Sequence, residues 1–351
     1  MHRTALIVGF TGAVALRLVE RLLADEWTIV GLCRQPPATS PSPRLTFLQA
    51  DLLDPAACAR AVSRGPSVSH VFYSARAKHG ETGTESIPEN VDMLAATLDA
   101  VIPTARELTH VHLVEGGKWY GMHLGPFATP ARENDPRPET PNFYHGQEDL
   151  LQERQRGQRW TWSASRPNIL CDFVPGRARN LTSVLGVYAA VLNELGLPLH
   201  FPGNAARWSA LMELTDATLL ANAINFISTD PRAANQAFNV TNGDVFRWSG
   251  MWPRLAAHFG MRPGDILPMS LAEFMRDKDP VWQHVVRRCG LSPSRLSGIA
   301  AWSFGDFVFR LDYDIMSSTT RLRQAGFHET LDSEAMFLRQ LRQYREARIL
   351  P

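Results

Sequence analysis

Short apolar runs alternate with helix-like patterns over the first 170 residues of the chain. An apolar run of about 4–8 residues is typical of a strand, and a run without polar alternation indicates a parallel strand buried on both faces. We expect strands at residues 4–8, 27–33, 45–48, 68–73, 108–113 and 160–165. Residues 86–102 instead place Val91, Leu94 and Leu98 on one side of a helix. The pattern therefore predicts an α/β fold with a Rossmann-type doubly wound parallel sheet.

Beyond about residue 170 the alternation fades and helical patterns dominate. They predict helices at about 181–195, 216–227, 251–259, 271–275, 281–289 and 334–346. We expect a Rossmann domain at residues 1–170, whose sheet is completed by about 236–246. Residues 171–235 and 247–351 are expected to form a smaller, mainly helical substrate-binding cap. Such a cap would cover the carboxyl ends of the strands, where open α/β sheets bind ligands.

A glycine turn follows the first predicted strand. It contains Gly9, Thr11, Gly12, Ala13 and Val14. Gly9 permits the turn, Gly12 lets the backbone approach a pyrophosphate, and the following helix N-terminus supplies free N–H groups. Because the turn stands between a strand and a helix, it predicts dinucleotide binding. A plain structural turn is the alternative.

Arg34 follows the second predicted strand and favours NADPH as the cofactor, so we expect the Rossmann domain at residues 1–170 to bind NADP. NAD sites usually place Asp or Glu here for the ribose 2′-hydroxyl, whereas an arginine accommodates the 2′-phosphate of NADP. A surface arginine is the alternative. The other predicted cofactor residues are Asp51 and Leu52 at the adenine edge, Ser74 and Ala75 near the phosphates and ribose, and Ile169 after the sixth strand.

Composition excludes several classes of function. The 351 residues carry a formal net charge of +1, without a basic run interleaved with aromatic residues, so nucleic acid is not expected as a partner. Four cysteines without CxxC spacing favour reduced thiols in a cytoplasmic protein. We find no signal peptide, no apolar run of the roughly 20 residues that a membrane helix needs, and no metal-ligand spacing. A homodimer is left open.

Glu-Gly-Gly-Lys-Trp-Tyr at residues 115–120 follows the fifth predicted strand. Its lysine, Lys118, is one of three lysines in a chain with 36 Lys and Arg, and lysine can tune the acidity of a neighbour. None of the tyrosines precedes a lysine by four positions, so the Tyr-x-x-x-Lys arrangement of short-chain dehydrogenases is missing. Lys118 could still meet Tyr144 at the start of the next helix. A solvated loop lysine and a packing tyrosine are the alternatives.

Short motifs of distinctive composition are spread over nearly the whole chain. They include Gly116-Gly117-Lys118-x-Tyr120, Gly125-Pro126-Phe127, Asn142-Phe143-Tyr144, Asn239-Val240-x-Asn242-Gly243, Pro280-Val281-Trp282 and Trp302-x-Phe304-Gly305-Asp306. Together they resemble the progesterone 5β-reductase/iridoid synthase-like family of atypical short-chain dehydrogenases. The resemblance implies NADPH-dependent reduction of the C=C bond of enones and enals, a small-molecule substrate, and Tyr144 and Lys118 as catalytic residues.

The resemblance also suggests a mechanism and a pocket. Tyr144 would donate a hydrogen bond to the oxygen on which the enolate charge develops, and Lys118 would tune the phenol. The expected substrate pocket contains Tyr120, His145, Asn180, Trp302 and Phe304.

Two departures from the family pattern concern the substrate more than the reaction. Glu115 replaces a threonine, and Arg76 stands where plant members carry tryptophan. Because fold alone does not fix chemistry, other functions stay open. They are a carbonyl reductase or an epimerase/dehydratase on the same fold, and a non-enzymatic NADP(H)-binding regulator.

Overall fold

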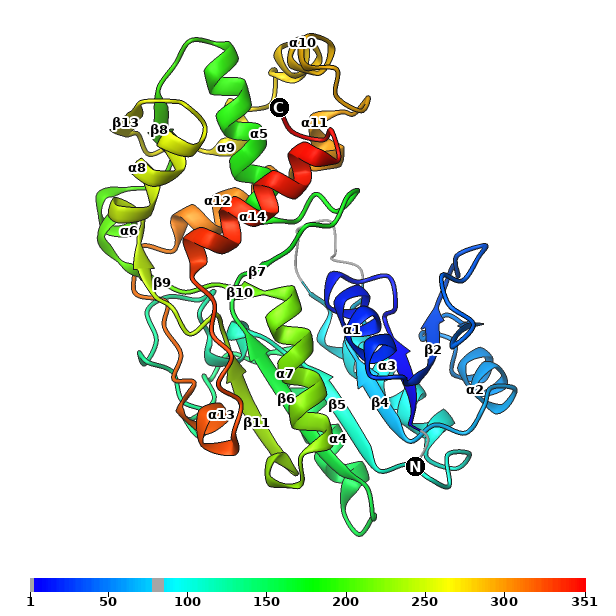
Figure 1. Ribbon diagram of the computed structural model, residues 1–351. Coiled ribbons are helices and arrows are strands. Elements are labelled where there is room, and N and C mark those ends of the chain that lie inside the picture. Colours follow the sequence, from blue (N-terminus) through cyan, green and yellow to red (C-terminus); the bar gives the residue numbers. More distant parts are fainter. Residues whose placement is uncertain (1–2, 78–84) are drawn as a thin grey trace.

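A computed structural model describes residues 3–77 and 85–351, and in these residues seven strands form one parallel sheet (Figure 1). The strand order is β11-β6-β5-β4-β1-β2-β3, and all neighbours are parallel. The strands are β1 (Thr4–Val8), β2 (Thr28–Cys33), β3 (Leu45–Gln49), β4 (His70–Tyr73), β5 (His110–Val114), β6 (Thr161–Pro167) and β11 (Gln236–Val240). Strand order reverses between β1 and β4, so the predicted doubly wound α/β fold is confirmed.

Helices cover both faces of this sheet. One face carries α1 (Ala13–Ala24) and α7 (Ala217–Thr229), and the other carries α2 (Pro55–Ser63), α3 (Ile87–Val101) and α4 (Phe143–Gln155). Ala5 and Ile7 of β1 pack with the first pair of helices, whereas Leu6 and Val8 pack with the other three. Every second side chain thus enters a different core, which explains why the strand is apolar throughout.

The packing of two helices differs from the predicted limits of the cap. Residues 171–235 and 247–351 were expected in the cap, yet α7 and α13 (Thr320–Ala325) pack in the core on the sheet. Figure 1 shows α7 lying along the sheet beside β6. Periodicity identified α7 as a helix but could not indicate which apolar surface it covers.

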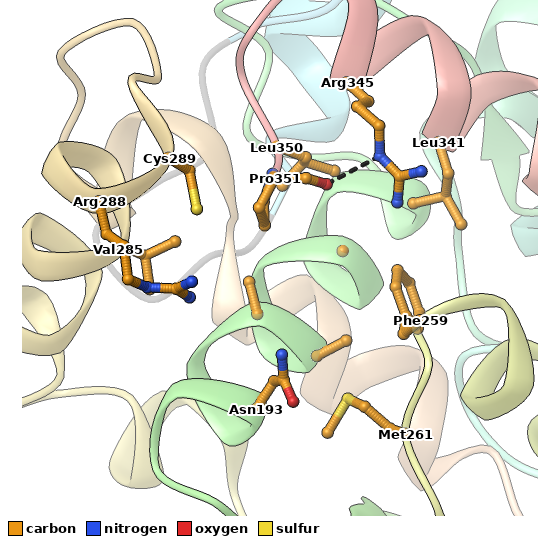
Figure 2. Close-up of a pocket in the computed structure, with 13 residues that line it drawn as sticks. Asn193, Phe259, Met261, Val285, Arg288, Cys289, Leu341, Arg345, Leu350 and Pro351 are labelled. Carbon is orange, nitrogen blue, oxygen red and sulfur yellow. Dashed lines mark hydrogen bonds between the residues drawn. The ribbon is translucent and has the colours of Figure 1, made fainter.

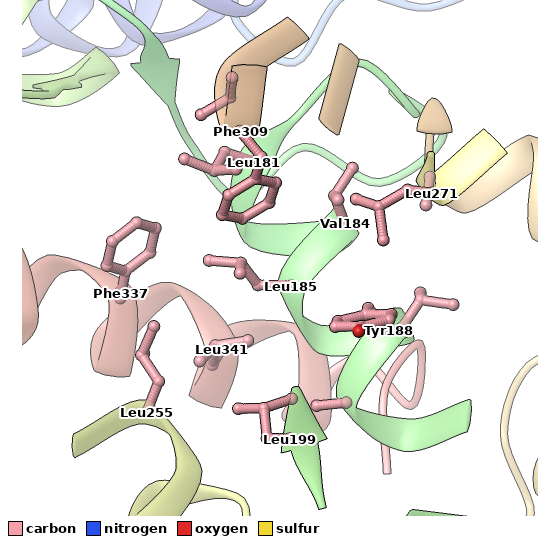
Figure 3. Packing of buried hydrophobic residues seen from close by; sticks show 14 of the residues in the cluster. Leu181, Val184, Leu185, Tyr188, Leu199, Leu255, Leu271, Phe309, Phe337 and Leu341 are labelled. Carbon is pink, nitrogen blue, oxygen red and sulfur yellow. The ribbon is translucent and has the colours of Figure 1, made fainter. Parts of the chain in front are cut away.

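The cap is built around α5 (Leu181–Glu194), which is buried from Leu181 to Leu192. Figure 3 shows Leu185 and Tyr188 of this helix among side chains from neighbouring cap elements. The helices around α5 include α8 (Trp248–His258), α10 (Asp279–Cys289), α12 (Trp302–Arg310) and α14 (Ser333–Glu346). The smaller mainly helical cap is therefore confirmed as part of the fold.

The other elements of the described residues are short. They are β7 (Leu170–Cys171), β8 (Leu199–Phe201), β9 (Leu211–Met212), β10 (Thr215–Asp216), β12 (Phe246–Arg247), β13 (Pro263–Ile266), α6 (Ala205–Ser209), α9 (Leu271–Phe274), α11 (Leu296–Ile299) and the 3-10 turns Gly117–Tyr120 and Pro231–Ala233. Across the described ranges, none of the helices combines the length and the apolar character that crossing a bilayer requires.

A cavity of about 210 Å³ lies inside the cap, between α5, α10 and the last residues of the chain (Figure 2). Leu350 packs over Gly186 of α5, and Arg345 donates a hydrogen bond from Nε to the carbonyl oxygen of Pro351 (2.9 Å). Among the described residues, none that lines this cavity belongs to the glycine turn. The cavity is therefore not the ligand crevice that the glycine turn predicts.

Candidate active site

The glycine turn brings the carboxyl ends of β1 and β4 into contact. Gly9 has a φ of +82°, and a Cβ there would lie 2.7 Å from the backbone nitrogen of Ala75. Ser74 donates a hydrogen bond from Oγ to the carbonyl oxygen of Val8 (3.2 Å), which fixes the second strand end. The strand order reverses between β1 and β4. In open α/β sheets the ligand crevice forms where the strand order reverses.

A cavity of about 300 Å³ opens at this crevice, between the sheet and the cap. Its lining includes five of the predicted cofactor residues, namely Gly12, Ala13, Val14, Ser74 and Ile169. It also includes Lys118 and Tyr144, together with Asn180 and Phe304 of the predicted substrate pocket. Residues from opposite ends of the chain therefore meet in one hollow.

The remaining predicted cofactor residues lie around this cavity rather than in its lining. Gly9 and Ala75 form the strand contact beneath it, and the carbonyl oxygen of Thr11 accepts a hydrogen bond from Arg177. Arg34 and Asp51 are exposed, and Leu52 is buried, just beyond β2 and β3 at the same edge of the sheet. Their contact with a cofactor stays a prediction.

Asn142 links the segments that carry the two predicted catalytic residues. It is the N-cap of α4, where its Oδ1 accepts a hydrogen bond from the backbone nitrogen of Tyr144 (2.9 Å). Its Nδ2 donates to the carbonyl oxygen of Lys118 (3.1 Å). A Cβ at Gly116 would lie 3.3 Å from the Tyr144 hydroxyl, so the phenol lies directly against the glycine backbone. Among the described residues that hydroxyl has no hydrogen-bond partner.

Sequence reasoning missed the ionic partner of Lys118. Nζ of Lys118 lies 2.8 Å from Oε2 of Glu85, and the other carboxylate oxygen of Glu85 lies 3.4 Å from the guanidinium of Arg76. Glu85 stands just before α3, in a polar stretch without a motif, so the sequence held no signal for this contact. The carboxylate holds the ammonium in place and offsets part of its charge.

A buried ionic cluster lies beside the cavity and joins β6, α4 and the segment after β5. Arg166 on β6 donates from Nε to Oε2 of Glu115 (2.7 Å) and from a terminal nitrogen to Oε2 of Glu148 (2.9 Å). Its guanidinium also lies 3.5 Å from the ring centre of Trp119. Burial raises the pKa of Glu115 to about 8, because this carboxyl group is withdrawn from water and shares Arg166 with a second acid.

Three residues predicted for the substrate pocket lie outside the cavity lining. Tyr120 is buried and donates from its hydroxyl to Oδ1 of Asn239 (2.7 Å). His145 contacts the carbonyl oxygen of Trp119 through Nε2 (2.9 Å), and Trp302 packs on the apolar core of the cap. Tyr120 and His145 therefore belong to the packing around the site, and Trp302 belongs to the cap core.

Asn180 lines the cavity but is also a structural residue. It is the N-cap of α5, accepts a hydrogen bond from the backbone nitrogen of Thr182 (2.9 Å), and donates to the carbonyl oxygen of Asp172. No group of three or more potential metal ligands occurs in residues 3–77 and 85–351. The cavity lining presents the phenol of Tyr144, the ammonium of Lys118, three guanidinium groups and the carboxyl groups of two acids.

Comparison with known proteins identifies relatives of full length. Residues 49–351 match the family described as a PRISE-like Rossmann-fold domain. The chain is 33% identical over 365 residues to the 3-oxo-Delta(4,5)-steroid 5-beta-reductase of Arabidopsis thaliana, covering 99% of this chain and 93% of that protein. It is 33% identical over 363 residues to the (S)-8-oxocitronellyl enol synthase of Catharanthus roseus, covering 99% and 92%. The predicted resemblance is thus confirmed.

Solved structures show the same fold at lower identity. A putative epimerase from Burkholderia cenocepacia has a TM-score of 0.69 at 17% identity, with 98% of this chain and 99% of that chain covered. The UDP-glucose 4-epimerase of Thermus thermophilus, solved in complex with NAD, has a TM-score of 0.66 at 15% identity, with the same coverage. Proteins of this fold therefore include one that holds a nicotinamide dinucleotide.

Proposed function

Because the chain belongs to the family of proteins with a PRISE-like Rossmann-fold domain, we propose that it is an oxidoreductase that reduces the C=C bond of α,β-unsaturated carbonyl compounds with NADPH. The observation that carries the proposal is the cavity at the glycine turn, which Lys118 and Tyr144 both line. The Arabidopsis thaliana relative is named for the reduction of 3-oxo-Delta(4,5)-steroids, which is a reaction of this class.

The glycine turn fits a dinucleotide. Helix α1 begins at Ala13, and no described side chain caps it at Gly12, so the N–H groups of its first turn are free for a phosphate. Arg177 donates to the carbonyl oxygen of Thr11 and adds a positive charge beside the turn. Arg34, exposed beyond β2, supports NADPH over NADH because its neighbours Cys33 and Gln35 provide no acid for a ribose hydroxyl.

In the proposed mechanism Tyr144 acts on the carbonyl oxygen of the substrate. Bound NADPH would supply the hydride for the β-carbon of the enone, and water would supply the proton for the α-carbon. As negative charge develops on the carbonyl oxygen, the Tyr144 hydroxyl donates a hydrogen bond to it, and one such preorganised donor contributes about 3–4 kcal/mol. Lys118 adds a positive charge to the same cavity and favours the electron-rich phenol.

The assignment is tested with Tyr144→Phe and Lys118→Met, assayed for NADPH oxidation with a reactive enone. We expect Tyr144→Phe to lower kcat by about a hundred- to a thousand-fold, because it removes the donor to the developing oxyanion. Lys118→Met is expected to lower kcat as well. Turnover at the wild-type rate by either protein would refute the catalytic role of the residue replaced.

Matched controls separate this effect from general damage. Tyr73→Phe removes a buried hydroxyl that has no partner among the described residues, and Lys278→Met removes a lysine in the cap. Both are expected to retain wild-type turnover. Oxidation of NADPH with the saturated ketone but not with the matched enone would instead indicate a carbonyl reductase.

We also propose a cytoplasmic location. The four cysteines support it, because in the described part of the chain all of them are free thiols and three are buried. We also propose that the protein forms a homodimer. Light scattering of the purified protein tests this oligomeric state.

A further inference from the structure

The cavity carries an excess of positive charge. Its lining contains Arg76, Lys118, Arg177 and Arg179. Two acids also line it, but each is paired with an arginine that lies outside the lining. Glu115 pairs with Arg166 (2.7 Å), and Asp172 pairs with Arg17 (2.9 Å). These acids therefore do not neutralise the four cations that face the hollow.

Arg76 lies beside the proposed catalytic tyrosine. The centre of its guanidinium is 5.1 Å from the ring centre of Tyr144 and 5.4 Å from that of Phe143. Its side chain is 39% exposed, and the contact with Glu85 is a long one at 3.4 Å. The guanidinium is therefore held over two aromatic rings with N–H groups still open to a ligand.

Arg179 approaches from the cap. Its guanidinium lies 4.7 Å from the ring centre of Phe304 on α12, and the negative charge of Glu85 acts on it as it does on Arg76. The guanidinium groups of Arg76 and Arg179 line the same cavity, and the positive charge of Arg179 acts on Arg76. Two like charges held near each other in a hollow are a cost that a bound anion would offset.

A charge balance indicates what this end of the cavity binds. Arg76, Lys118 and Arg179 bring three positive charges to this end of the cavity, and Glu85 contacts two of them. A negatively charged group on the substrate would offset the positive charge at this end of the cavity. Arginine side chains match the planar carboxylate group.

We propose that the substrate is an enone or enal that carries a carboxylate, bound by Arg76 and Arg179, with its apolar part against Phe304 and Phe307. This inference rests on the proposed function. The phosphates of the cofactor would bind elsewhere in the cavity, at the glycine turn and Arg177. Arg76 lies instead on Tyr144, and Arg179 lies on Phe304.

The test uses straight-chain enones with a terminal carboxylate, in several lengths, and the carboxamide of each length as a neutral match. We expect wild-type kcat/KM to be at least about tenfold higher for the carboxylate in the length that reaches the two arginines, which corresponds to about 1.4 kcal/mol. Arg76→Gln and Arg179→Gln are each expected to lower the carboxylate-to-carboxamide ratio by about tenfold. Arg310→Gln, an exposed arginine on α12, is the control and is expected to keep the wild-type ratio.

Each outcome decides one question. Equal kcat/KM for carboxylates and carboxamides at every length overturns this inference while the proposed function stands. Failure to reduce any enone, charged or neutral, overturns the proposed function itself. If the two variants raise the KM for NADPH and leave the ratio unchanged, the arginines bind the cofactor and the inference is wrong. Circular dichroism of each variant verifies that the ratio was measured on folded protein.

Discussion

The ring nitrogens of His110 and His112 on β5 form hydrogen bonds with side-chain hydroxyl groups on β6. His112 lies 2.8 Å from the Ser163 hydroxyl and 3.0 Å from that of Ser165, while His110 lies 2.7 Å from Ser163 and 2.8 Å from Thr161. Burial lowers the pKa of His112 to about 3 and places that of His110 well below 6.5. Both rings are therefore neutral in the folded protein at pH 7, and their role is structural.

These histidines make the protein sensitive to acid. Between pH 6.5 and about 3 the unfolded chain binds a proton at His112 that the folded chain does not, so the free energy of unfolding falls as the pH drops. For His112 alone we expect a loss of about 2 kcal/mol between pH 7 and pH 5. Urea unfolding at both pH values measures it.

His112→Gln is the informative variant, because it keeps a polar side chain and removes the titration. It is expected to make the pH dependence shallower by about the same 2 kcal/mol, whatever its effect on stability at pH 7. An unchanged slope would mean that His112 is protonated in the folded state.

At the scale of elements, the turn between β1 and α1 depends on one backbone position. Gly9→Ala would place a Cβ 2.7 Å from the backbone of Ala75 at a φ of +82°. We expect this variant to lose about 1–3 kcal/mol of stability and to bind NADPH at least about tenfold more weakly, because the crevice between the two strands must open. Urea unfolding and fluorescence titration with NADPH measure the two effects.

Gly157→Ala isolates the steric part of that effect. Gly157 has a φ of +76°, and among the described atoms nothing lies within 4 Å of the position of its Cβ. This variant should lose about 1 kcal/mol from backbone strain and bind NADPH normally. Equal losses in both variants would show that the contact with Ala75 does not matter.

Periodicity predicted most elements of the nucleotide-binding half because their two apolar faces are a local property. The strand expected at 160–165 is found at Thr161–Pro167, and the helix expected at 86–102 is found at Ile87–Val101. Helix α2 was missed because Pro55–Ser63 is short and Val62 is its only large apolar residue. The position of α7 on the sheet depends on its contacts with α1, which no local pattern contains.

At the scale of the whole molecule, the site depends on segments that are far apart in sequence. Lys118 and Tyr144 were found from motifs on neighbouring elements, and the structure places both in the cavity. Arg76 and Arg179 come from different halves of the chain, and their positions depend on how the cap lies on the sheet. The sequence marked Arg76 as a departure from the family but held no signal for its proximity to Arg179.

The segment that carries Arg177, Arg179 and Asn180 into the cavity is held by Arg17 of α1. Arg17 pairs with Asp172 (2.9 Å) and donates to the carbonyl oxygen of Phe173 (2.7 Å). The side chain of Asp172 is 6% exposed, so its carboxylate depends on this partner. Arg17 does not line the cavity, which makes it a positioning residue for the contact between sheet and cap.

Arg17→Gln tests this dependence. Loss of the partner leaves Asp172 unpaired, and because Arg17 is itself partly exposed we expect a loss of about 1–3 kcal/mol in stability, below that of a fully buried pair. The segment that carries Arg177, Arg179 and Asn180 loosens, so the KM values for NADPH and for the enone should rise several-fold. We expect kcat to change less, since Tyr144 and Lys118 keep their places.

Arg21→Gln on the same helix is the control. It removes an exposed pair with Asp25 and should change stability by about 0.5 kcal/mol or less, with normal kinetics. A fall in kcat without a rise in KM would mean that Arg17 acts on the chemical step, and would contradict its role in joining cap to sheet.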